Sequence, residues 1–254
     1  MQTNVKPDVQ AYLNLLDLAA PPKPTLAFLE RLHERHLLRV PFENLNIHLK
    51  RPIRLDIPSL FDKIVRQKRG GFCYELNHLF HWLLRSLGYD SILVSARVKN
   101  ERGGFNPEFD HLALIVTLDE PYLADVGFGN AFRRPLPISG EVREDIGGAY
   151  RVRRLSKGEY AMQRQSGESW SDAYRFTLVP RRIEDFMDMC RYHQTSPDSH
   201  FTRNRICSRA TRTGRITLTD TALKVTEGGE QKTRPVTSEE EWFRLLERHF
   251  GIRP

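Results

Sequence analysis

Several features that mark common protein classes are absent from this chain of 254 residues. No apolar run approaches the roughly 20 residues that a membrane-spanning helix needs. The N-terminal stretch MQTNVKPDVQ is polar and lacks the apolar centre of a signal peptide. We therefore expect a cytoplasmic protein with no membrane partner.

Cysteine is scarce as well. The three cysteines are Cys73, Cys190 and Cys207. An odd and sparse set does not describe a disulfide framework, and no CxxC pair or Cys/His cluster has the spacing of a zinc site. Two pairs of histidines are spaced three residues apart, His33 with His36 and His78 with His81. No third ligand accompanies either pair, so we expect exposed or capping histidines on helices and no metal site.

Motifs that bind nucleotides are missing too. The chain has no Walker A motif, no GxGxxG after an expected strand and no (Q/R)xxGx(G/A) phosphate-cradling motif. It also has no RNP-like aromatic motif and no zinc finger. We expect no nucleic-acid partner, although the net charge of +7 attracts polyanions. A salt-sensitive shift of DNA or RNA mobility would identify one.

The positive charge is densest late in the chain. Five arginines fall in one short stretch: Arg203, Arg205, Arg209, Arg212 and Arg215. Any single arginine of this kind usually belongs to a solvated face. As a group they suggest an anion site for a phosphorylated ligand, with one or two arginines in contact with it.

The apolar spacing changes from a helical to a strand period along the chain. Helices are expected at residues 8–18, 25–38, 56–65, 73–84, 182–192 and 238–250. Strands are expected at residues 91–98, 111–118, 121–128, 150–154, 159–163, 174–179, 201–205, 215–219 and 223–226. This order predicts an α+β fold: a helical bundle, then a sheet or barrel, then a mixed α/β segment.

The segment RGGFCYELN, residues 69–77, is the most informative in the chain. Its two glycines allow a sharp turn and a close approach of backbone. A cysteine at the start of a helix lies at the positive end of the helix dipole, which favours thiolate over thiol. The first amides of that helix are free to bind an oxyanion. This segment alone supports a nucleophilic Cys73 and a small buried Cys73 equally well.

Two further residues supply the partners that a catalytic cysteine needs, a base and an acceptor that orients the base. His111 begins an apolar strand, and Asp125 lies in the stretch YLADVGFG. A lone histidine or aspartate at a strand end is usually structural. Adjacent strands that present both beside a helix bearing Cys73 have the geometry and chain order of papain-like and transglutaminase-like enzymes. We therefore predict a triad of Cys73, His111 and Asp125.

Four motifs in order give the chain a family resemblance. They are PFENL at 41–45, RGGFCYELN at 69–77, His111 at the head of a strand, and DVGFG at 125–129. Together they closely resemble the arylamine N-acetyltransferases over residues 41–128, and more weakly at SPDSHF, residues 196–201. The resemblance implies a helical bundle over 1–88 with the catalytic cysteine, a β-barrel-like domain over 89–185 with the histidine and aspartate, and an α/β lid over 186–254.

The resemblance also implies roles for individual residues. Cys73 matches the acetylated nucleophile, His111 the base and Asp125 its orienter. The residues matching aromatics of the acceptor pocket are Phe42, Phe128 and Phe201. For Phe201 a place in the ordinary core is as well supported as the pocket. Arg69 and Glu43 match a pair that we expect to be structural.

The implied reaction is a ping-pong acetyl transfer, of the kind used in xenobiotic metabolism, from acetyl-CoA to an arylamine or arylhydrazine. We expect the late arginines to help hold the CoA phosphates. In the family the loop before the catalytic histidine lies near the cofactor pyrophosphate, but here residues 106–110 include two acids, which suit phosphate poorly. Two alternatives remain: a cysteine hydrolase or transglutaminase-type enzyme, and another acyl-CoA user such as a macrolactam-closing amide synthase or a malonyl transferase.

Overall fold

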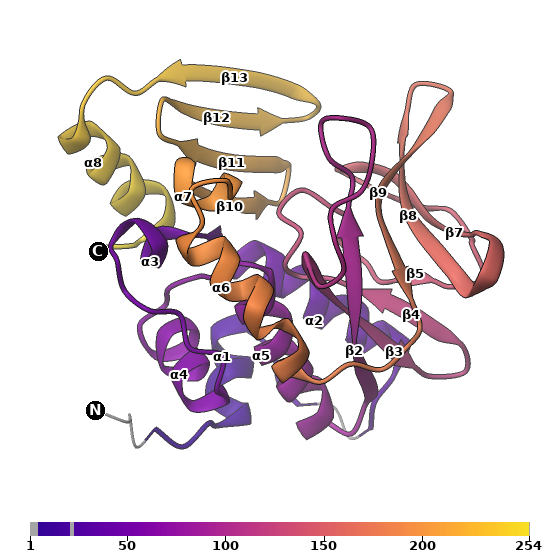
Figure 1. Ribbon diagram of the computed structural model, residues 1–254. Helices are drawn as coiled ribbons and strands as arrows, with labels where there is room; N and C mark the ends of the chain where they lie inside the picture. The colour runs from indigo at the N-terminus through magenta and orange to yellow at the C-terminus, as the bar shows by residue number, and fades with distance from the viewer. Residues whose placement is uncertain (1–4, 21–22, 254) are drawn as a thin grey trace.

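The computed structural model describes residues 5–20 and 23–253, with helices filling the N-terminal third and two sheets following (Figure 1). The N-terminal helices are α1 (Val9–Leu16), α2 (Leu26–Arg39), α3 (Leu45–His48), α4 (Ile57–Phe61), the π-helix η1 (Asp62–Arg66) and α5 (Cys73–Ser86). No helix within the described ranges is long and apolar enough to cross a bilayer.

Side-chain caps explain where these helices begin. The carboxylate of Asp8 accepts from the backbone amides of Gln10 and Ala11, and Thr25 Oγ1 accepts from the amide of Phe28. Asp56 caps α4, which begins where the helix over 56–65 was expected. The helix predicted at 56–65 then continues as the π-helix η1, which the apolar spacing did not indicate. Gly88, with φ of +85°, ends the α5 region.

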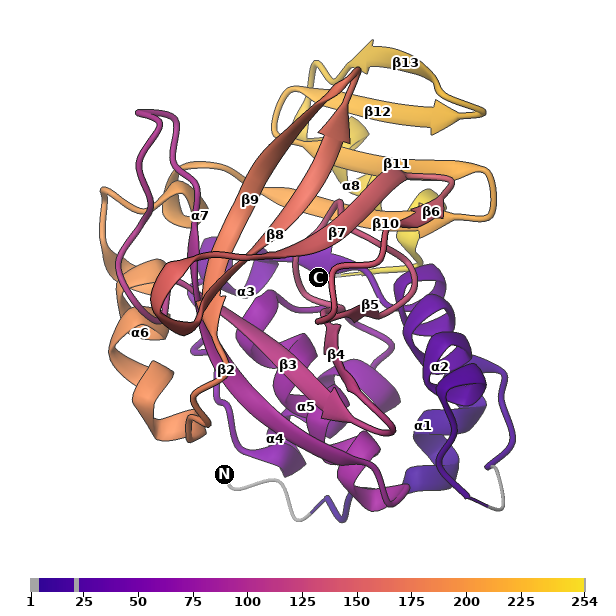
Figure 2. The same cartoon turned by 90° about the vertical axis from the view of Figure 1, so that its right-hand side faces the viewer.

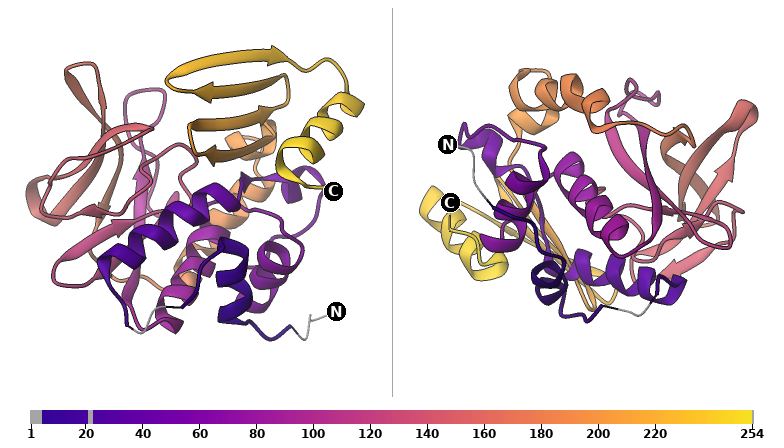
Figure 3. Two further views of the ribbon diagram at one scale, coloured as in Figure 1. Left: turned by 180° about the vertical axis from the view of Figure 1, so that it is seen from behind. Right: turned by 90° about the horizontal axis from the view of Figure 1, so that it is seen from below.

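Helix α5 occupies the middle of the molecule, between the other N-terminal helices and the larger sheet (Figure 3). Its residues Leu76, Leu79, Phe80, Leu83 and Leu84 are fully buried in the largest hydrophobic cluster, which also takes in α1, α2 and β3. Because α5 is packed on all of these elements, its first residue, Cys73, is held firmly in place.

The larger sheet has eight antiparallel strands in the order β5-β4-β3-β2-β9-β8-β7-β6 and curls into a nearly closed barrel (Figure 2). Its strands are β2 (Asp90–Val98), β3 (His111–Thr117), β4 (Pro121–Ala124), β5 (Leu136–Pro137), β6 (Arg143–Asp145), β7 (Gly148–Arg154), β8 (Glu159–Ser166) and β9 (Ser169–Thr177). The 3-10 turn η2 (Ser156–Gly158) links β7 to β8. In β3 every residue but Thr117 is buried, as its apolar run predicted.

One expected strand is too long. The prediction of a strand over 121–128 is wrong beyond Ala124, where β4 ends. The amide of Asp125 turns away from the sheet and donates to Nε2 of His33 at 3.0 Å instead. The chain therefore leaves the ladder where Asp125 faces the helices.

The smaller sheet has five antiparallel strands in the order β1-β10-β11-β12-β13. They are β1 (Phe42–Glu43), β10 (Ile206–Thr211), β11 (Gly214–Thr219), β12 (Ala222–Glu227) and β13 (Glu230–Pro235). The sheet packs against α8 (Glu239–Phe250), which begins at the Ser238 cap as expected. Because β1 comes from the N-terminal third and pairs with β10, this sheet joins the N-terminal third of the chain to its C-terminal part.

Three short helices connect the two sheets: η3 (Ile183–Phe186), α6 (Met187–Thr195) and α7 (His200–Arg203). Helix α6 runs across the front of α5 in Figure 1. The prediction of a strand at 201–205 is wrong, because Ser199 Oγ accepts from the amide of Phe201 and starts the helical turn α7 there.

The expectation of exposed or capping histidines is wrong for His33 and His36, which are both fully buried on α2. The ring of His36 lies edge-on to Phe80, with ring centres 5.3 Å apart. Neither of its nitrogens has a hydrogen-bond partner among the described residues. His36 is therefore a neutral imidazole in an apolar setting, since burial lowers its pKa to about 3.

Replacing His36 with leucine should flatten the loss of stability in acid. The unfolded chain takes up a proton near pH 6.5, whereas native His36 resists protonation until about pH 3, so stability falls as the pH drops below 6.5. Between pH 7 and pH 5 this histidine accounts for about 2 kcal/mol of that loss. Urea unfolding at both pH values measures it. Equal losses in wild type and His36→Leu would contradict the assignment; His48→Leu, at a partly exposed site, is the control.

Candidate active site

Cys73 lies at the first position of α5, directly after the two-glycine turn. A Cβ at Gly70 would come within 1.9 Å of the backbone oxygen of Pro41, and one at Gly71 within 2.8 Å of the Glu75 side chain. Only glycine fits either position, as the sequence suggested. The turn therefore brings the backbone before Cys73 against β1.

Two buried ion pairs lie next to this turn. Arg69 Nη2 lies 2.8 Å from Glu43 Oε1, and Lys63 Nζ lies 2.8 Å from Glu75 Oε1. Burial opposes ionisation of Glu43, but Lys63 and Arg69 together hold its pKa below the usual value. The expected pair of Arg69 and Glu43 is present. It ties β1 to the turn that carries Cys73.

His111 and Asp125 meet beside Cys73. Nε2 of His111 lies 2.7 Å from Oδ2 of Asp125, and both side chains are buried. Burial works against the imidazolium, but the Asp125 carboxylate and a hydrogen bond with Cys73 outweigh it and raise the pKa of His111 to about 10. Since Nε2 is engaged by Asp125, Nδ1 is the ring nitrogen left for the sulfur of Cys73.

Four donors hold the Asp125 carboxylate. Oδ2 accepts from His111 and from the Tyr174 hydroxyl at 3.0 Å. Oδ1 accepts from Asn77 Nδ2 and from the amide of Gly127, both at 2.9 Å. Burial alone would raise its pKa, but His111 and these hydrogen bonds lower it. Asp125 is therefore a fixed anion next to the imidazole.

Three of these supporting residues were not identified from the sequence. Asn77 lies one helical turn after Cys73, so the i, i+4 spacing on α5 was a usable signal. Its amide also donates to the Leu112 oxygen and accepts from the amide of Val126, which fixes its orientation. Tyr174 and Gly127 carried weaker signals, an inward position on β9 and a place in the DVGFG motif.

His33 is a further support that the sequence did not reveal. Its Nδ1 is 2.8 Å from the Arg133 backbone oxygen, and its Nε2 accepts the Asp125 amide. The proton therefore resides on Nδ1. No local pattern could have linked α2 to Asp125 across this distance in the chain.

The three aromatics expected at an acceptor pocket all line one cavity of about 820 Å³ together with Cys73 and His111. The ring centre of Phe128 is 5.1 Å from that of His111. The ring centres of Phe42 and Phe201 are 6.1 Å apart. Phe201 thus lies at the cleft, although the strand expected for it is a helix.

The same cleft is also lined by three cationic side chains, those of Lys99, Arg102 and Arg203. Arg203 is the one member of the late arginine cluster that lines this cleft. Arg205 binds Asp220 and Glu239 instead, at 2.6 and 2.9 Å. The members of the cluster thus lie apart, and the expectation that one or two of them contact a phosphorylated ligand stays a prediction, with Arg203 as the member placed at the cleft.

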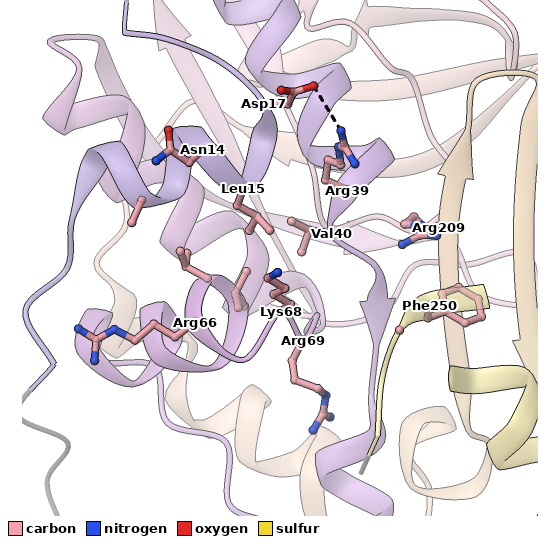
Figure 4. Close-up of a pocket in the computed structure, with 14 residues that line it drawn as sticks. Asn14, Leu15, Asp17, Arg39, Val40, Arg66, Lys68, Arg69, Arg209 and Phe250 are labelled. Carbon is pink, nitrogen blue, oxygen red and sulfur yellow. Dashed lines mark hydrogen bonds and ion pairs between the residues drawn. The ribbon is translucent and has the colours of Figure 1, made fainter. Parts of the chain in front are cut away.

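Arg209 of that cluster lies at a different cavity, of about 630 Å³, between α1 and the ends of α2 and α8 (Figure 4). Its guanidinium donates to the His249 oxygen and lies 5.7 Å from the ring centre of Phe250. Arg215 is half-buried on β11, where it donates to Ser208. Neither side chain lines the cleft that contains Cys73.

The two acids of the loop before His111 are held by internal contacts. Glu108 accepts from Ser95 Oγ at 2.6 Å, and Asp110 accepts from Asn106 at 3.0 Å. Phe109 between them has φ of +68° and donates its amide to Ser95. The loop is thus a tightly bonded turn, which sets the position of His111.

No group of three or more His, Cys, Asp or Glu side chains that could hold a metal is found within residues 5–20 and 23–253. A cysteine at a helix start and an imidazole that line one aromatic cleft, with a carboxylate bonded to the imidazole, are features of enzymes that transfer or hydrolyse acyl groups through cysteine. The helices and the barrel-like sheet place them there.

Comparison with known proteins narrows this class. The sequence model of the N-acetyltransferase family matches residues 25–253. Over 213 residues the chain is 38% identical to the chicken arylamine N-acetyltransferase pineal gland isozyme NAT-3, covering 76% of this chain and 73% of that one. The chain belongs to the arylamine N-acetyltransferase family.

Two further similarities bear on the site. The structure superposes on an arylamine N-acetyltransferase of Bacillus cereus, described as having a Cys-His-Glu catalytic triad, with a TM-score of 0.89 and 29% identity over 97% of this chain and 99% of that one. The chain is also 30% identical over 250 residues to proansamycin X synthase of Amycolatopsis mediterranei, covering 95% and 96% of the two.

Proposed function

We propose that this protein transfers acetyl groups from acetyl-CoA to arylamines and arylhydrazines through an acetyl-Cys73 intermediate. The observation that supports it most directly is the cleft itself, where Cys73 begins α5 beside the His111–Asp125 pair. The Bacillus cereus relative, with its cysteine, histidine and carboxylate triad, supports the same roles here.

In the first half-reaction, the Cys73 sulfur attacks the thioester carbonyl of acetyl-CoA. Amides at the start of α5 stabilise the oxyanion, since the first turn of a helix has N–H groups without partners inside the helix. The C–S bond to CoA breaks, and the CoA sulfur takes the proton from His111. One thioester replaces another, so this exchange is nearly isoenergetic.

In the second half-reaction, the amine nitrogen attacks acetyl-Cys73 and His111 accepts its proton. The C–S bond breaks, the amide leaves, and the thiolate–imidazolium pair is restored. Phe42, Phe128 and Phe201 suit a flat apolar acceptor and help exclude water, which would hydrolyse the intermediate.

We further propose the papain- and transglutaminase-like arrangement for this core, with units at 1–88, 89–185 and 186–254 and the last acting as a lid. Residues of α6 and α7 line the cleft, which supports a covering role. The three buried cysteines are unpaired, in keeping with a reducing cytoplasm.

Intact mass after incubation with acetyl-CoA alone tests the proposal. One acetyl group should be added, and peptide mapping should place it on Cys73 rather than on Cys190 or Cys207. Adding an arylamine should then remove it and yield the acetylated amine. A protein that stays unmodified, or that releases acetate without an amine acceptor as its main reaction, would contradict it and favour the cysteine-hydrolase alternative.

A second candidate is acyl transfer within a larger substrate, because proansamycin X synthase is similar over nearly the whole chain. The discriminating measurement is the competition of acetyl-CoA with malonyl-CoA and longer acyl thioesters for Cys73. Preferential labelling by a bulky acyl thioester would favour this second candidate.

The phosphates of CoA are expected at Lys99, Arg102 and Arg203, the cations of the cleft. A phosphate contact binds ground state and transition state alike, so glutamine at each position should raise KM for acetyl-CoA and leave kcat nearly unchanged. Each exposed contact is worth about 1–2 kcal/mol, from the strength of charge-assisted hydrogen bonds. Arg212→Gln, at an exposed arginine outside the cleft, is the matched control. An unchanged KM in all three variants would place the phosphates elsewhere.

A further inference from the structure

The cleft contains a second imidazole and carboxylate that acetyl transfer does not use. His193 lies on α6, and Asp110 directly precedes His111 in the chain. Their side chains are only 9% and 8% exposed, and both line the cavity that holds Cys73. Nε2 of His193 lies 3.3 Å from Oδ1 of Asp110.

Ser199 fixes which nitrogen of His193 carries the proton. Ser199 Oγ accepts from the amide of Phe201 and lies 3.0 Å from Nδ1 of His193. Its hydroxyl can donate to Nδ1, and the imidazole proton then lies on Nε2, where it faces Asp110. The opposite tautomer would turn a nitrogen lone pair toward the Asp110 carboxylate, an arrangement that both groups disfavour.

This Nε2–H is a buried donor with no aligned hydrogen-bond partner within the described part of the chain. Asp110 contributes a matching acceptor, because Asn106 holds its Oδ2 at 3.0 Å while Oδ1 faces His193. A donor and an acceptor thus lie side by side on one cavity wall. Buried polar groups of this kind are normally satisfied, here by whatever fills the cleft.

The pair continues the aromatic wall of the acceptor pocket. The ring centre of Phe201 is 6.1 Å from that of Phe42 and 5.2 Å from that of His193. The ring of Tyr74, next to Cys73 in the chain, is 6.1 Å from His193. A flat molecule against Phe42 and Phe201 therefore has His193 and Asp110 at its edge.

We propose that His193 and Asp110 select arylamine acceptors bearing a phenolic hydroxyl. This inference deepens the proposed function and rests on it. A phenolic hydroxyl accepts from Nε2–H of His193 and donates to Oδ1 of Asp110. Because these two atoms are 3.3 Å apart, the hydroxyl oxygen can lie within hydrogen-bond distance of both. A methyl group leaves both unpaired, and a carboxylate meets the charge of Asp110.

The test compares kcat/KM for the 3- and 4-isomers of aminophenol, methylaniline and aminobenzoate. In ping-pong kinetics this ratio for the acceptor reports only the step from acetyl-Cys73. At least one aminophenol should exceed its methyl counterpart by about tenfold or more, and its carboxylate counterpart by more. His193→Phe keeps an aromatic ring but no donor, and should reduce the hydroxyl-to-methyl ratio to within about threefold.

Two variants separate hydrogen bonding from packing. His193→Gln retains an N–H donor and should keep more of the preference than His193→Phe. His81→Phe makes the same change at a histidine whose Nδ1 also meets a serine, Ser91, but which does not line the cleft, and it should keep the wild-type ratio.

Wild-type selectivity decides the proposal even where a variant fails to fold. No preference for any aminophenol over its methyl counterpart, or an unchanged preference in folded His193→Phe, would overturn it. Acetylation of wild-type Cys73 by acetyl-CoA, measured in the same preparation, separates this failure from a failure of the proposed function.

Discussion

Cys73→Ala is expected to abolish acetyl transfer and leave the fold intact. The sulfur is the only group at the head of α5 that can form the acetyl intermediate, so kcat should fall by on the order of 10⁴-fold or more, as when other covalent nucleophiles are removed. The loss of one sulfur atom from a cleft wall should alter the free energy of unfolding little. Steady-state turnover and urea unfolding measure the two effects.

The other two cysteines are natural controls for that experiment. Burial raises the pKa of Cys190 to about 12 and that of Cys207 well above its ordinary value, so both remain thiols. Cys190 also meets the side chain of Gln194, and Cys207 lies inside the smaller sheet. Alanine at either position should leave most activity. Appreciable turnover by Cys73→Ala would refute the role of Cys73. So would a loss of turnover in both Cys190→Ala and Cys207→Ala.

Local signals predicted much of this fold because they depend on neighbours in the chain. The helices expected from residues 8, 25 and 56 begin at the side-chain caps Asp8, Thr25 and Asp56, and Gly88 follows the helix expected at 73–84. The short strand β1 gave no such signal, because two residues have no readable period. Likewise β13 is exposed throughout, so no apolar alternation marks it.

The environment of Asp125 could not be predicted in the same way. Its partners come from α2, α5 and β9, at separations of 92, 48 and 49 residues. A buried carboxylate needs several donors, but the sequence does not say which distant residues supply them. Only the folded chain places His33, Asn77 and Tyr174 around it.

The late arginines illustrate the same limit for charge. Five arginines close together in sequence suggested an anion site contacted by one or two of them, without saying which, because β10 and β11 pair antiparallel and direct the side chains of Arg209 and Arg215 differently. Arg205 satisfies two carboxylates and lies 4.2 Å from the ring centre of Trp242. Arg209 and Arg215 are half-buried elsewhere. The density of charge along a chain therefore does not say which of its side chains lie at one site.

Asp125→Asn should reduce kcat/KM by about 10³- to 10⁴-fold, the range seen when a base loses its orienting carboxylate. All four neighbours of this carboxylate are donors, so the new amide NH₂ group must face two of them. On the Oδ1 side it would meet Asn77 and the amide of Gly127, which cannot become acceptors. It therefore turns toward His111, whose Nε2 becomes the acceptor, so that the proton moves to Nδ1 beside Cys73.

Tyr174→Phe is the matched control, since it removes one donor to Asp125 and leaves the tautomer of His111 unchanged. Its expected loss of kcat/KM is about tenfold at most, as for one hydrogen bond. An Asp125→Asn protein that folds and retains activity within tenfold of Tyr174→Phe would show that Asp125 does not orient the base.

The pH dependence of Asp125→Asn separates catalysis from folding. The raised pKa of His111 stabilises the native state below about pH 6.5, an effect lost as the pH rises toward 10. The lowered pKa of Asp125 stabilises it above about pH 4, an effect lost in acid. The variant should therefore fall furthest below wild type in stability between those limits, and the difference should shrink on either side.

Without the carboxylate, burial lowers the pKa of His111, so alkylation of Cys73 by iodoacetamide at pH 7 should slow with the loss of the imidazolium. Alkylation as fast as in wild type would mean that the charge of Asp125 does not sustain the thiolate–imidazolium pair.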